Sequence, residues 1–400
     1  MSEMSYLEKL LDGVEVEWLS LSKVFNLRNG YTPSKTKKEF WENGDIPWFR
    51  MDDIRENGRI LGNSLQRISS CAVKGGKLFP ENSILISTSA TIGEHALITV
   101  PHLANQRFTC LALKESYVDC FDIKFLFYYC FSLAEWCRKN TTMSSFASVD
   151  MDGFKKFLIP LPCPDNPEKS LAIQSEIVRI LDKFTALTAE LTAELTAELT
   201  ARKKQYNYYR EQLMNLEERE DTREMSIGDI YDFQYGTGNT IPKSGGQYPV
   251  YGSNGIVGSH DKYNSEDSPV IGHIGAYAGI VNWGQGKHFV TYNGVICRHK
   301  SKEVLQKYAY HLLLLQDFGS KSNSASQPFV SYNILNAPIV FVPPLQEQAR
   351  IVAILDKFHT LTSSITEELP REIELRQKQY EYYRDLLFSF PTPETAQNTH

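Results

Sequence analysis

The stretch Ile177-Val-Arg-Ile-Leu-Asp-Lys-Phe-Thr-Ala-Leu-Thr188 returns, at an offset of 174, as Ile351-Val-Ala-Ile-Leu-Asp-Lys-Phe-His-Thr-Leu-Thr362. At the same offset, Lys204-Gln-Tyr-Asn-Tyr-Tyr-Arg210 returns as Lys378-Gln-Tyr-Glu-Tyr-Tyr-Arg384. The first copy also holds three tandem Thr-Ala-Glu-Leu tetrapeptides, from Thr188 to Leu199. Because both ends share one offset, the chain contains an ungapped duplication of one long segment.

Both copies have the apolar spacing of a long helix. Their apolar residues recur every three or four positions, which places them in one stripe, and Ala, Glu and Leu favour helix. About 40 residues at 1.5 Å each give a helix roughly 60 Å long. Such a helix must bury its stripe, and the second copy is the expected partner. A solvated helical linker is the alternative. Pro370 falls opposite Thr196 and predicts a kink or a missing backbone bond in the second helix.

The side chains along this stripe are the candidates for the spacer and for a subunit interface. They are Phe184, Leu187, Leu191, Leu195, Leu199, Tyr206 and Tyr209 in the first copy, and Phe358, Tyr380 and Tyr383 in the second.

Bulk composition bounds the class of protein. The chain has 400 residues, 42% of them hydrophobic, which is enough for two cored domains. Its start has no signal-like apolar run and no stretch is long enough for a membrane span, so we expect a cytoplasmic protein that does not contact a membrane. Seven cysteines without a Cys-x-x-Cys pair argue against a disulfide frame or a zinc site.

The net charge of -6 is unevenly distributed. Residues 161–220 hold eleven acidic and eight basic side chains, and residues 345–400 hold nine and six, so these two segments carry the whole excess. The remaining regions are neutral and can each carry a basic face for nucleic acid. The acidic helices are better suited to a protein partner.

Two globular regions separate the helices. Leu21 to Gly30 and Ile227 to Gly236 correspond at an offset of 206, and short alternating runs with Gly, Pro, Asn and Asp turns follow in both. Each region has one aromatic-rich helix, near Ile123 to Arg138 and near Val304 to Asp317, and ends on a Pro-containing strand. The expected fold class is α+β, with two mixed α/β domains separated by two long antiparallel coiled-coil-like helices in a pseudo-two-fold repeat.

The expected boundaries follow from this plan. They are an N-terminal segment at 1–16 that completes a cyclic repeat, a first globular domain at 17–162, a central region with the first long helix and the tetrapeptide repeats at 163–220, a second globular domain at 221–344, a C-terminal helix at 345–388 and a disordered tail at 389–400.

The sequence contains no catalytic constellation. A triphosphate-binding Gly-x-x-x-x-Gly-Lys-[Ser/Thr] loop, an amino-methyltransferase Asn-Pro-Pro-aromatic tetrapeptide and a His-Glu-x-x-His metal motif are all missing. We therefore expect no enzyme activity, no cofactor and no metal in this chain.

Candidate DNA-binding side chains occur in both globular regions. Loop lysines can contact phosphates, while Arg, Asn, Gln and Ser read base edges. Each of these residues, taken singly, is more typical of a solvated or turn-capping side chain. However, they occur at corresponding places in both globular regions, and this supports a role in DNA binding. The first region offers Lys35, Lys37, Lys38, Trp48, Arg50, Arg55, Ser87, Thr88, Ser89, Asn105, Gln106 and Arg107. The second offers Lys243, Tyr251, Ser253, Asn254, His273, Tyr277 and Arg298.

These residues and motifs resemble the specificity subunits of type I restriction-modification systems over nearly the whole chain. The matching text is Leu21-Ser-Lys-Val, Gly30-Tyr-Thr-Pro33, Ile46-Pro-Trp48, Thr91-Ile-Gly93, Asn105-Gln106, Ile159-Pro-Leu-Pro162 and Gln346-Glu-Gln348. The tandem Thr-Ala-Glu-Leu resembles the IC group. The second region departs from the pattern, since Tyr248-Pro-Val-Tyr251 replaces Ile-Pro-Trp.

The resemblance implies a non-catalytic subunit that binds double-stranded DNA. Each recognition domain would read half of a split, asymmetric site, and the helices would dock two modification subunits. Those subunits would supply S-adenosylmethionine and base flipping, and restriction subunits would add ATP- and Mg-dependent translocation and cleavage. The alternative is a coiled-coil structural protein of the adhesin kind with two β-rich ligand-binding modules. That protein would need export, for which the sequence shows no signal.

Overall fold

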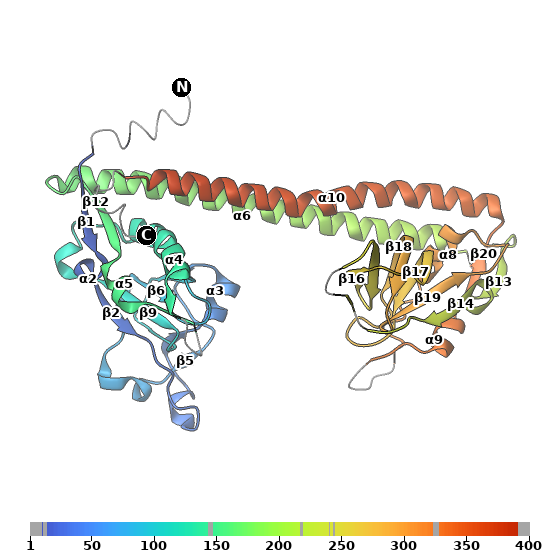
Figure 1. Ribbon diagram of the computed structural model, residues 1–400, viewed down its shortest axis with the longest axis horizontal. Helices are drawn as coiled ribbons and strands as arrows, with labels where there is room; N and C mark the ends of the chain where they lie inside the picture. Colours follow the sequence, from blue (N-terminus) through green and yellow to red (C-terminus); the bar gives the residue numbers. More distant parts are fainter. Residues whose placement is uncertain are drawn as a thin grey trace. The chain divides into compact units, whose positions relative to one another are not determined.

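The computed structural model describes residues 10, 14–142, 147–216, 219–239, 241–242, 245–322 and 328–390, and only the backbone of 359–370. Residue contacts divide the chain into two units. The first contains residues 1–192 and 373–400, and the second contains residues 193–372. Each unit therefore combines one globular domain with parts of both repeated helices (Figure 1).

The repeated segments form the two long helices expected from the sequence. Helix α6 is Pro167–Met214, with 48 residues, and α10 is Leu345–Leu387, with 43 residues. Pro167 suits the first helical position, where its missing N–H has no partner to lose. Pro370 does not interrupt the second long helix, because α10 continues through that position.

The first unit is built around a five-stranded sheet in the order β2-β9-β6-β7-β4. A three-stranded sheet, β5-β3-β8, and two small pairs, β1-β12 and β10-β11, complete it. The strands are β1 Val16–Ser20, β2 Phe25–Asn29, β3 Ile46–Phe49, β4 Ile60–Leu61, β5 Arg67–Ile68, β6 Ser83–Ser87, β7 His95–Ile98, β8 Leu103–Ala104, β9 Phe108–Leu113, β10 Thr141–Thr142, β11 Ser148–Val149 and β12 Leu158–Pro162. The helices are α2 Leu21–Val24, α3 Met51–Asn57, α4 Ile123–Lys139 and α5 Met151–Lys156.

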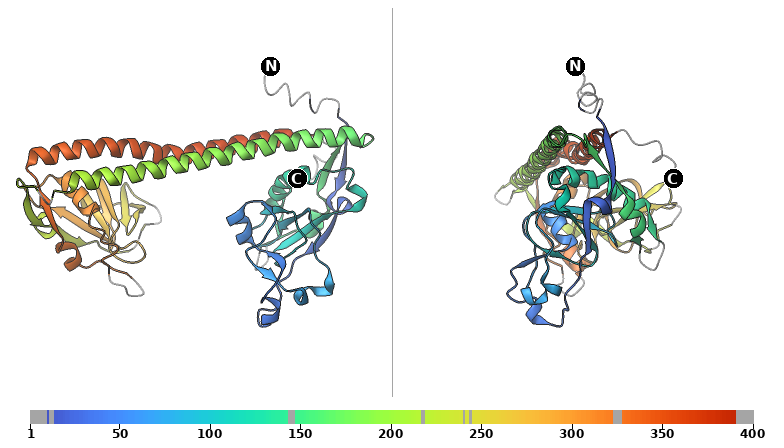
Figure 2. Two further views of the ribbon diagram at one scale, coloured as in Figure 1. Left: turned by 180° about the vertical axis from the view of Figure 1, so that it is seen from behind. Right: turned by 90° about the vertical axis from the view of Figure 1, so that its left-hand side faces the viewer.

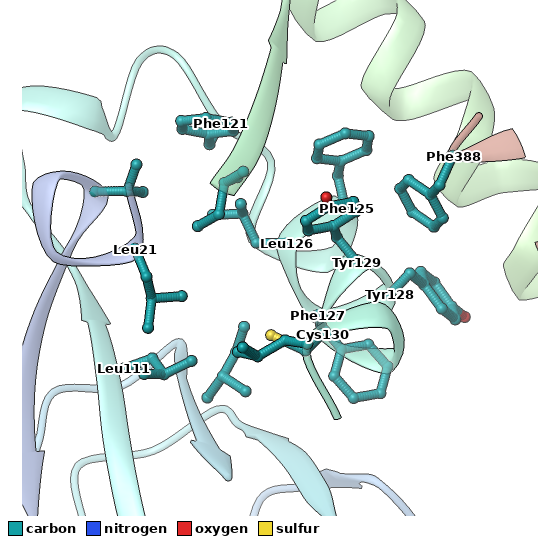
Figure 3. Close-up of a cluster of buried hydrophobic side chains, with 14 of the residues drawn as sticks. Leu21, Leu111, Phe121, Phe125, Leu126, Phe127, Tyr128, Tyr129, Cys130 and Phe388 are labelled. Carbon is teal, nitrogen blue, oxygen red and sulfur yellow. The ribbon is translucent and has the colours of Figure 1, made fainter. Parts of the chain in front are cut away.

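Both faces of the five-stranded sheet are buried. Alternate side chains point to opposite faces, so Ile84 and Ile86 of β6 belong to one core and Leu85 to another. The first core is filled by α4, whose Phe125 and Tyr129 contact Phe388, with ring centroids 5.3 and 5.4 Å apart (Figure 3). The second core lies against β3 and β8 and contains the Trp48 ring.

The second unit repeats this plan with a six-stranded sheet, β14-β19-β17-β18-β15-β16, and the pair β13-β20. Both sheets are seen from two further directions in Figure 2. The strands are β13 Arg223–Ser226, β14 Tyr231–Tyr235, β15 Tyr248–Gly252, β16 Gly255–His260, β17 Ser265–Gly272, β18 Val281–Val290, β19 Gly294–His299 and β20 Ile339–Val342. The helices are α7 Ile227–Ile230, α8 Gln306–Leu314 and α9 Tyr332–Asn336.

The internal correspondence seen in the sequence is also present in the elements. One turn of helix precedes a five-residue strand in both units, as α2-β2 and as α7-β14. The pairs β2-β9 and β14-β19 are antiparallel, whereas β3-β8 and β15-β18 are parallel. The pairs β1-β12 and β13-β20 join the two ends of each domain.

Both units also use the same positions of the long helices. Ile177 and Leu181 of α6 are fully buried in the first unit, and Ile351 and Leu355 of α10 are fully buried in the second. The other end of each helix contributes as well, through Met214 in the second unit and Phe388 in the first. All these pairs share the offset of the repeat, so each domain is held by the start of one helix and the end of the other.

Several predicted boundaries differ from the structure. The predicted helix near Val304 to Asp317 is shorter, since α8 covers only Gln306–Leu314. Phe390 is 4% exposed and its ring lies 6.2 Å from that of Phe125, so the predicted tail at 389–400 began too early. Residues 391–400, and most of the N-terminal segment 1–16, lie outside the described residues.

Candidate nucleic-acid interface

A cavity of about 770 Å³ opens on the first unit. Eight of the twelve candidates predicted for this domain line it, namely Lys35, Lys38, Trp48, Arg50, Arg55, Asn105, Gln106 and Arg107. The other lining residues are not among the predicted candidates, and they are Thr32, Trp41, Glu42, Met51, Asp52 and Gln66. Gln66 had no local signal, because only the packing of distant loops brings it to the cavity.

The parallel pair β3-β8 brings the cavity's two main segments together. Trp48 and Phe49 of β3 lie beside Leu103 and Ala104 of β8, so both strands end at the same edge. The chain then turns into α3 on one side and into the turn at 105–107 on the other. The N–H of Asn105 donates to the carbonyl of Phe49 over 3.1 Å and joins the two ends.

Gly30 allows the loop before the cavity to pass close to this edge. A Cβ at position 30 would lie 2.1 Å from the carbonyl oxygen of Asn105. Only glycine avoids this clash with backbone, which explains the Gly30-Tyr-Thr-Pro33 turn seen in the sequence. The indole N–H of Trp48 donates to the carbonyl of Tyr31 over 3.0 Å. Trp48 is 3% exposed, so it forms the wall of the cavity rather than a surface that reads bases.

The lining is predominantly cationic. Three arginines and two lysines face two carboxylates, Glu42 and Asp52. Asp52 lies 3.6 Å from Arg50 and 3.9 Å from Arg55. These pairs are partly exposed and therefore contribute little stability, but they orient both guanidinium groups at the cavity. A polyanion is the ligand that this charge distribution favours.

The turn at 105–107 presents its side chains differently. The Asn105 carboxamide accepts from the backbone N–H of Arg107 over 3.0 Å and shapes the turn. Gln106 contacts the hydroxyl of Thr32. Arg107 is exposed, and its guanidinium makes no hydrogen bond to the described residues. Arg107 is therefore the side chain of this turn that can engage a ligand without first breaking a contact.

The remaining four candidates of the first domain do not line this cavity. The ammonium of Lys37 lies 5.0 Å from the centre of the Phe40 ring. Ser87 is fully buried and donates to the carbonyl of Ser89, while the Thr88 and Thr109 hydroxyls are 3.1 Å apart. Ser89 forms a bridge with Ser148. The three hydroxyl residues thus stabilise the end of β6, and Ser87 is inaccessible to a base.

Three candidates of the second domain make contacts within the domain itself. Tyr251 is 7% exposed and its hydroxyl donates to the carbonyl of Trp283 over 3.2 Å; burial raises the pKa of Tyr251. His273 is 5% exposed, and its ring stacks on that of Tyr235 at 4.1 Å. Arg298 donates to the Gln234 side chain and to the carbonyl of Asn264.

The other candidates of the second domain lie at accessible turns. Ser253 and Asn254 connect β15 with β16, and Asn254 is exposed. Tyr277 is 50% exposed. Lys243 lies outside the described residues.

The second domain also contains an aromatic stack that was not predicted from the sequence. The Tyr235 ring lies between those of His273 and Tyr332, with centroids 4.1 and 4.2 Å away. Burial raises the pKa of Tyr235, and the neighbouring Tyr332 adds to the shift. Tyr292, which is 48% exposed, lies beside this stack. Single tyrosines at the end of β14, in a turn and at the start of α9 gave no signal that they would meet.

The long helices make equivalent ring contacts in the two units. Phe184 stacks on Tyr383 at 5.3 Å in the first unit, and Phe358 stacks on Tyr209 at 5.3 Å in the second. Tyr206 and Tyr380 are half-buried, as are Leu191, Leu195 and Leu199, whereas Leu187 is 53% exposed.

Two further tyrosines on these helices are more exposed than the predicted set. Tyr208 and Tyr382 are both 58% exposed and occupy corresponding positions of the repeat. The two helices thus carry equivalent apolar surface that the globular domains leave uncovered.

The described residues contain no group of three or more His, Cys, Asp or Glu side chains placed to hold a metal ion. All seven cysteines are free thiols. None of the described helices combines the length and apolarity that a membrane span requires.

Comparison with known proteins finds one family. The type I restriction modification DNA specificity domain matches residues 13–201 and 219–375. The chain is 66% identical over 375 residues to the type I restriction enzyme EcoprrI specificity subunit of Escherichia coli, covering 92% of this chain and 93% of that one. It is 37% identical over 448 residues to the EcoR124I/EcoR124II specificity subunit of the same organism, covering all of both chains.

A solved structure shares the fold at low identity. It comes from work on the structural basis of complex assembly and conformational transition of the type I R-M system. The TM-score is 0.66 at 15% identity, and the match covers 93% of this chain and 97% of that one.

Proposed function

The chain belongs to the family of type I restriction-modification specificity subunits, and from this premise we propose how its parts share that role. It is a non-catalytic, DNA-binding subunit. Each recognition domain reads one half of a bipartite, asymmetric site, and the helices set the spacing and dock the modification subunits. One observation carries this assignment, namely that two copies of one domain plan are each held by equivalent positions of two copies of one helix.

The first domain meets DNA at its cationic cavity. Lys35 and Lys38 serve as phosphate contacts, while Gln106 and Arg107 reach base edges from the turn between β8 and β9. Arginine is the most frequent specific reader of guanine, because its fork matches two acceptors in the major groove. In the second domain the accessible candidates are Ser253, Asn254 and Tyr277. Lys243, which lies outside the described residues, stays a proposed DNA contact.

Helices α6 and α10 form an antiparallel coiled coil with a pseudo-two-fold axis. The paired stacks Phe184–Tyr383 and Phe358–Tyr209 support this arrangement, since each is the other's counterpart in the repeat. The exposed Tyr208 and Tyr382 are suited to docking one modification subunit each, because exposed aromatic residues are typical anchors of protein interfaces. The tandem Thr-Ala-Glu-Leu supports membership of the IC group.

The catalytic activities reside in the partner subunits. Two modification subunits supply S-adenosylmethionine and base flipping, and restriction subunits supply the ATP- and Mg-dependent steps. The complex acts in the cytoplasm, where its DNA is found. This chain itself holds no cofactor.

Selection of random duplexes by the complex of this chain with its modification subunits tests the assignment. We expect the captured DNA to share two short, different sequences separated by a constant gap. Capture without any sequence preference, or failure to retain DNA with the partner present, would contradict the assignment and favour the structural alternative.

A further inference from the structure

Each long helix carries one fully buried glutamine near its start. Gln174 of α6 and Gln348 of α10 occupy corresponding positions of the repeat, and neither side chain exposes any surface. Burying an amide is costly unless its donors and its acceptor all find partners. Gln348 closes the Gln346-Glu-Gln348 motif, to which the proposed function assigns no role.

Gln174 connects α6 to the start of α4 in the first unit. Its Oε1 accepts from the backbone N–H of Asp122 over 2.9 Å, and Asp122 is the residue that caps α4. Its Nε2 donates to the carbonyl of Cys120 over 2.8 Å and to the hydroxyl of Ser170 over 3.0 Å. The amide is therefore fully satisfied by the domain and by its own helix.

Gln348 makes the same connection in the second unit. Its Oε1 accepts from the backbone N–H of Leu305 over 2.7 Å, and Leu305 is the residue that precedes α8. Its Nε2 donates to the carbonyl of Glu303 over 2.9 Å and to that of Pro343 over 2.8 Å. Both amides thus bind two backbone groups, two positions apart, that lead into the domain's aromatic helix.

Hydrogen bonds are directional, so they can fix the rotation and the axial position of a helix that apolar packing alone leaves free. Ile177 and Leu181 beside Gln174 are fully buried, but dispersion and the hydrophobic effect have little directional preference. A fully satisfied buried polar group specifies one arrangement of its neighbours. In the first unit Asp182 adds to this, since it accepts from Lys124 and from the Tyr128 hydroxyl, both over 2.7 Å.

We propose that Gln174 and Gln348 are positioning residues for the spacing of the DNA half-sites. Each amide holds its helix at one rotation and one axial position against its recognition domain. This inference rests on the proposed function. A change of one base pair in the gap moves a half-site by about 3.4 Å and roughly 34–36°. A subunit that distinguishes adjacent gap lengths must hold each domain within less than that shift, and the two amides supply the restraint.

The test uses Gln174→Met and Gln348→Met in the complete complex with modification subunits. Methionine keeps the length and volume of the side chain but removes all three hydrogen bonds. Gln212→Met is the matched control, because Gln212 is an exposed residue of the same helix α6. Binding is measured to duplexes that carry both half-sites with the native gap, and with one base pair more or less.

We expect the Met variants to lose discrimination between gaps while still reading the same bases in each half. The preference for the native gap should fall by about tenfold, the factor that corresponds to roughly 1.4 kcal/mol. The Gln212→Met control should keep the preference unchanged. A gap preference as strong in both Met variants as in the control would overturn the inference. So would loss of the half-site bases themselves, because that result assigns the amides a merely structural role.

Two further results keep the inference separate from other failures. If a Met variant does not fold, Ser170→Ala removes one of the three bonds of Gln174 and should still weaken the gap preference. An unchanged preference in Ser170→Ala would then overturn the inference. If the unaltered complex selects no bipartite sequence, the proposed function fails instead.

Discussion

Arg107 and Lys38 line the same cavity, but we expect Arg107 to contact a base and Lys38 to contact a phosphate. Arg107 extends from the turn between two strands, and its guanidinium makes no hydrogen bond to the described residues. Lys38 lies on a short helical turn, Lys38–Phe40, at the edge of the same cavity. A guanidinium fork can distinguish bases, whereas an ammonium near the backbone contributes charge without sequence information.

Substitution of these two residues should separate base reading from phosphate binding. Arg107→Ala should cost about 1–3 kcal/mol on the native site and relax the preference at one base position. Lys38→Ala should weaken binding to all sequences and lower the salt slope by roughly one. Binding to native and scrambled duplexes at several salt concentrations measures both effects. Lys139→Ala is the matched control, because Lys139 is an exposed lysine of the same domain that pairs with Glu135 and does not line the cavity. An unchanged profile for Arg107→Ala would remove Arg107 from the reading set.

Two buried histidines make the stability of the first unit sensitive to acid. Burial lowers the pKa of His95 to about 3, and the nearby Arg59 adds to the shift. Burial lowers the pKa of His102 to about 4. The folded state keeps both rings neutral, whereas the unfolded chain binds protons below a pKa of about 6.5. The contribution of these two rings to stability is therefore constant above this pH and is lost as the pH falls.

We expect each histidine to reduce the free energy of unfolding by up to about 1.4 kcal/mol per pH unit between roughly pH 6.5 and 4.5. This window lies above the range in which most carboxylates titrate. Denaturant unfolding followed by tryptophan fluorescence measures it, because four of the five tryptophans, all but Trp283, belong to the first unit. The pH dependence should be shallower in the double variant His95→Gln, His102→Gln. The same slope in that variant would show that other groups are responsible.

At the scale of elements, the polar groups of the tandem repeat in α6 are bonded within the helix itself. The hydroxyls of Thr188, Thr192 and Thr200 each donate to the carbonyl four positions earlier, over 2.8 Å. Leu195 and Leu199 are only half-buried. Because its polar groups are satisfied within the helix, one tetrapeptide can be removed without leaving a buried group unpaired.

Deletion of Thr196 to Leu199 should shorten the gap between the half-sites by one to two base pairs. Four residues are about 6 Å of helix and about 400° of rotation, so the apolar stripe returns nearly to register. The rotation beyond a full turn, about 40°, is close to the twist of one base pair and favours the smaller change. Selection of bound DNA by the deletion variant measures the gap. Deletion of only Thr196 and Ala197 is the control, and it should abolish assembly by turning the stripe away. An unaltered gap after the four-residue deletion would show that the repeat is not the ruler.

At the scale of the molecule, each domain is a closed module on a shared support. The pair β1-β12 joins the ends of the first domain, and β13-β20 joins the ends of the second. The anchors Ile177 and Phe388, with Gln174, lie outside residues 17–162. A recognition domain can therefore be replaced while the surface that holds it remains.

Exchange of residues 17–162 for the matching part of a relative should change one half of the recognised sequence and leave the other half intact. The gap should also stay constant, because the helices and both glutamines are retained. Selection of bound duplexes by the complex of the hybrid chain measures all three features. A simultaneous change in both halves would contradict independent reading.

The sequence by itself determined the two helices, the domain plan and the correspondence of their strands. These features depend on repeats, on a three-to-four-residue apolar period and on turn residues, all of which are local or are visible by self-comparison. The family followed from the same motifs. The sequence also identified eight lining residues of the cationic cavity, because loop lysines and arginines near an Ile-Pro-Trp strand are a local pattern.

Only the tertiary structure decided which candidates face solvent and what they contact. Ser87, Tyr251 and His273 have side chains of the kinds that can contact bases, but long-range packing buries them. Gln66 reaches the cavity, and Gln174 and Gln348 reach their backbone partners, through chain segments distant in sequence. Burial and hydrogen-bond partners are properties of neighbours in space, and no local pattern encodes those neighbours.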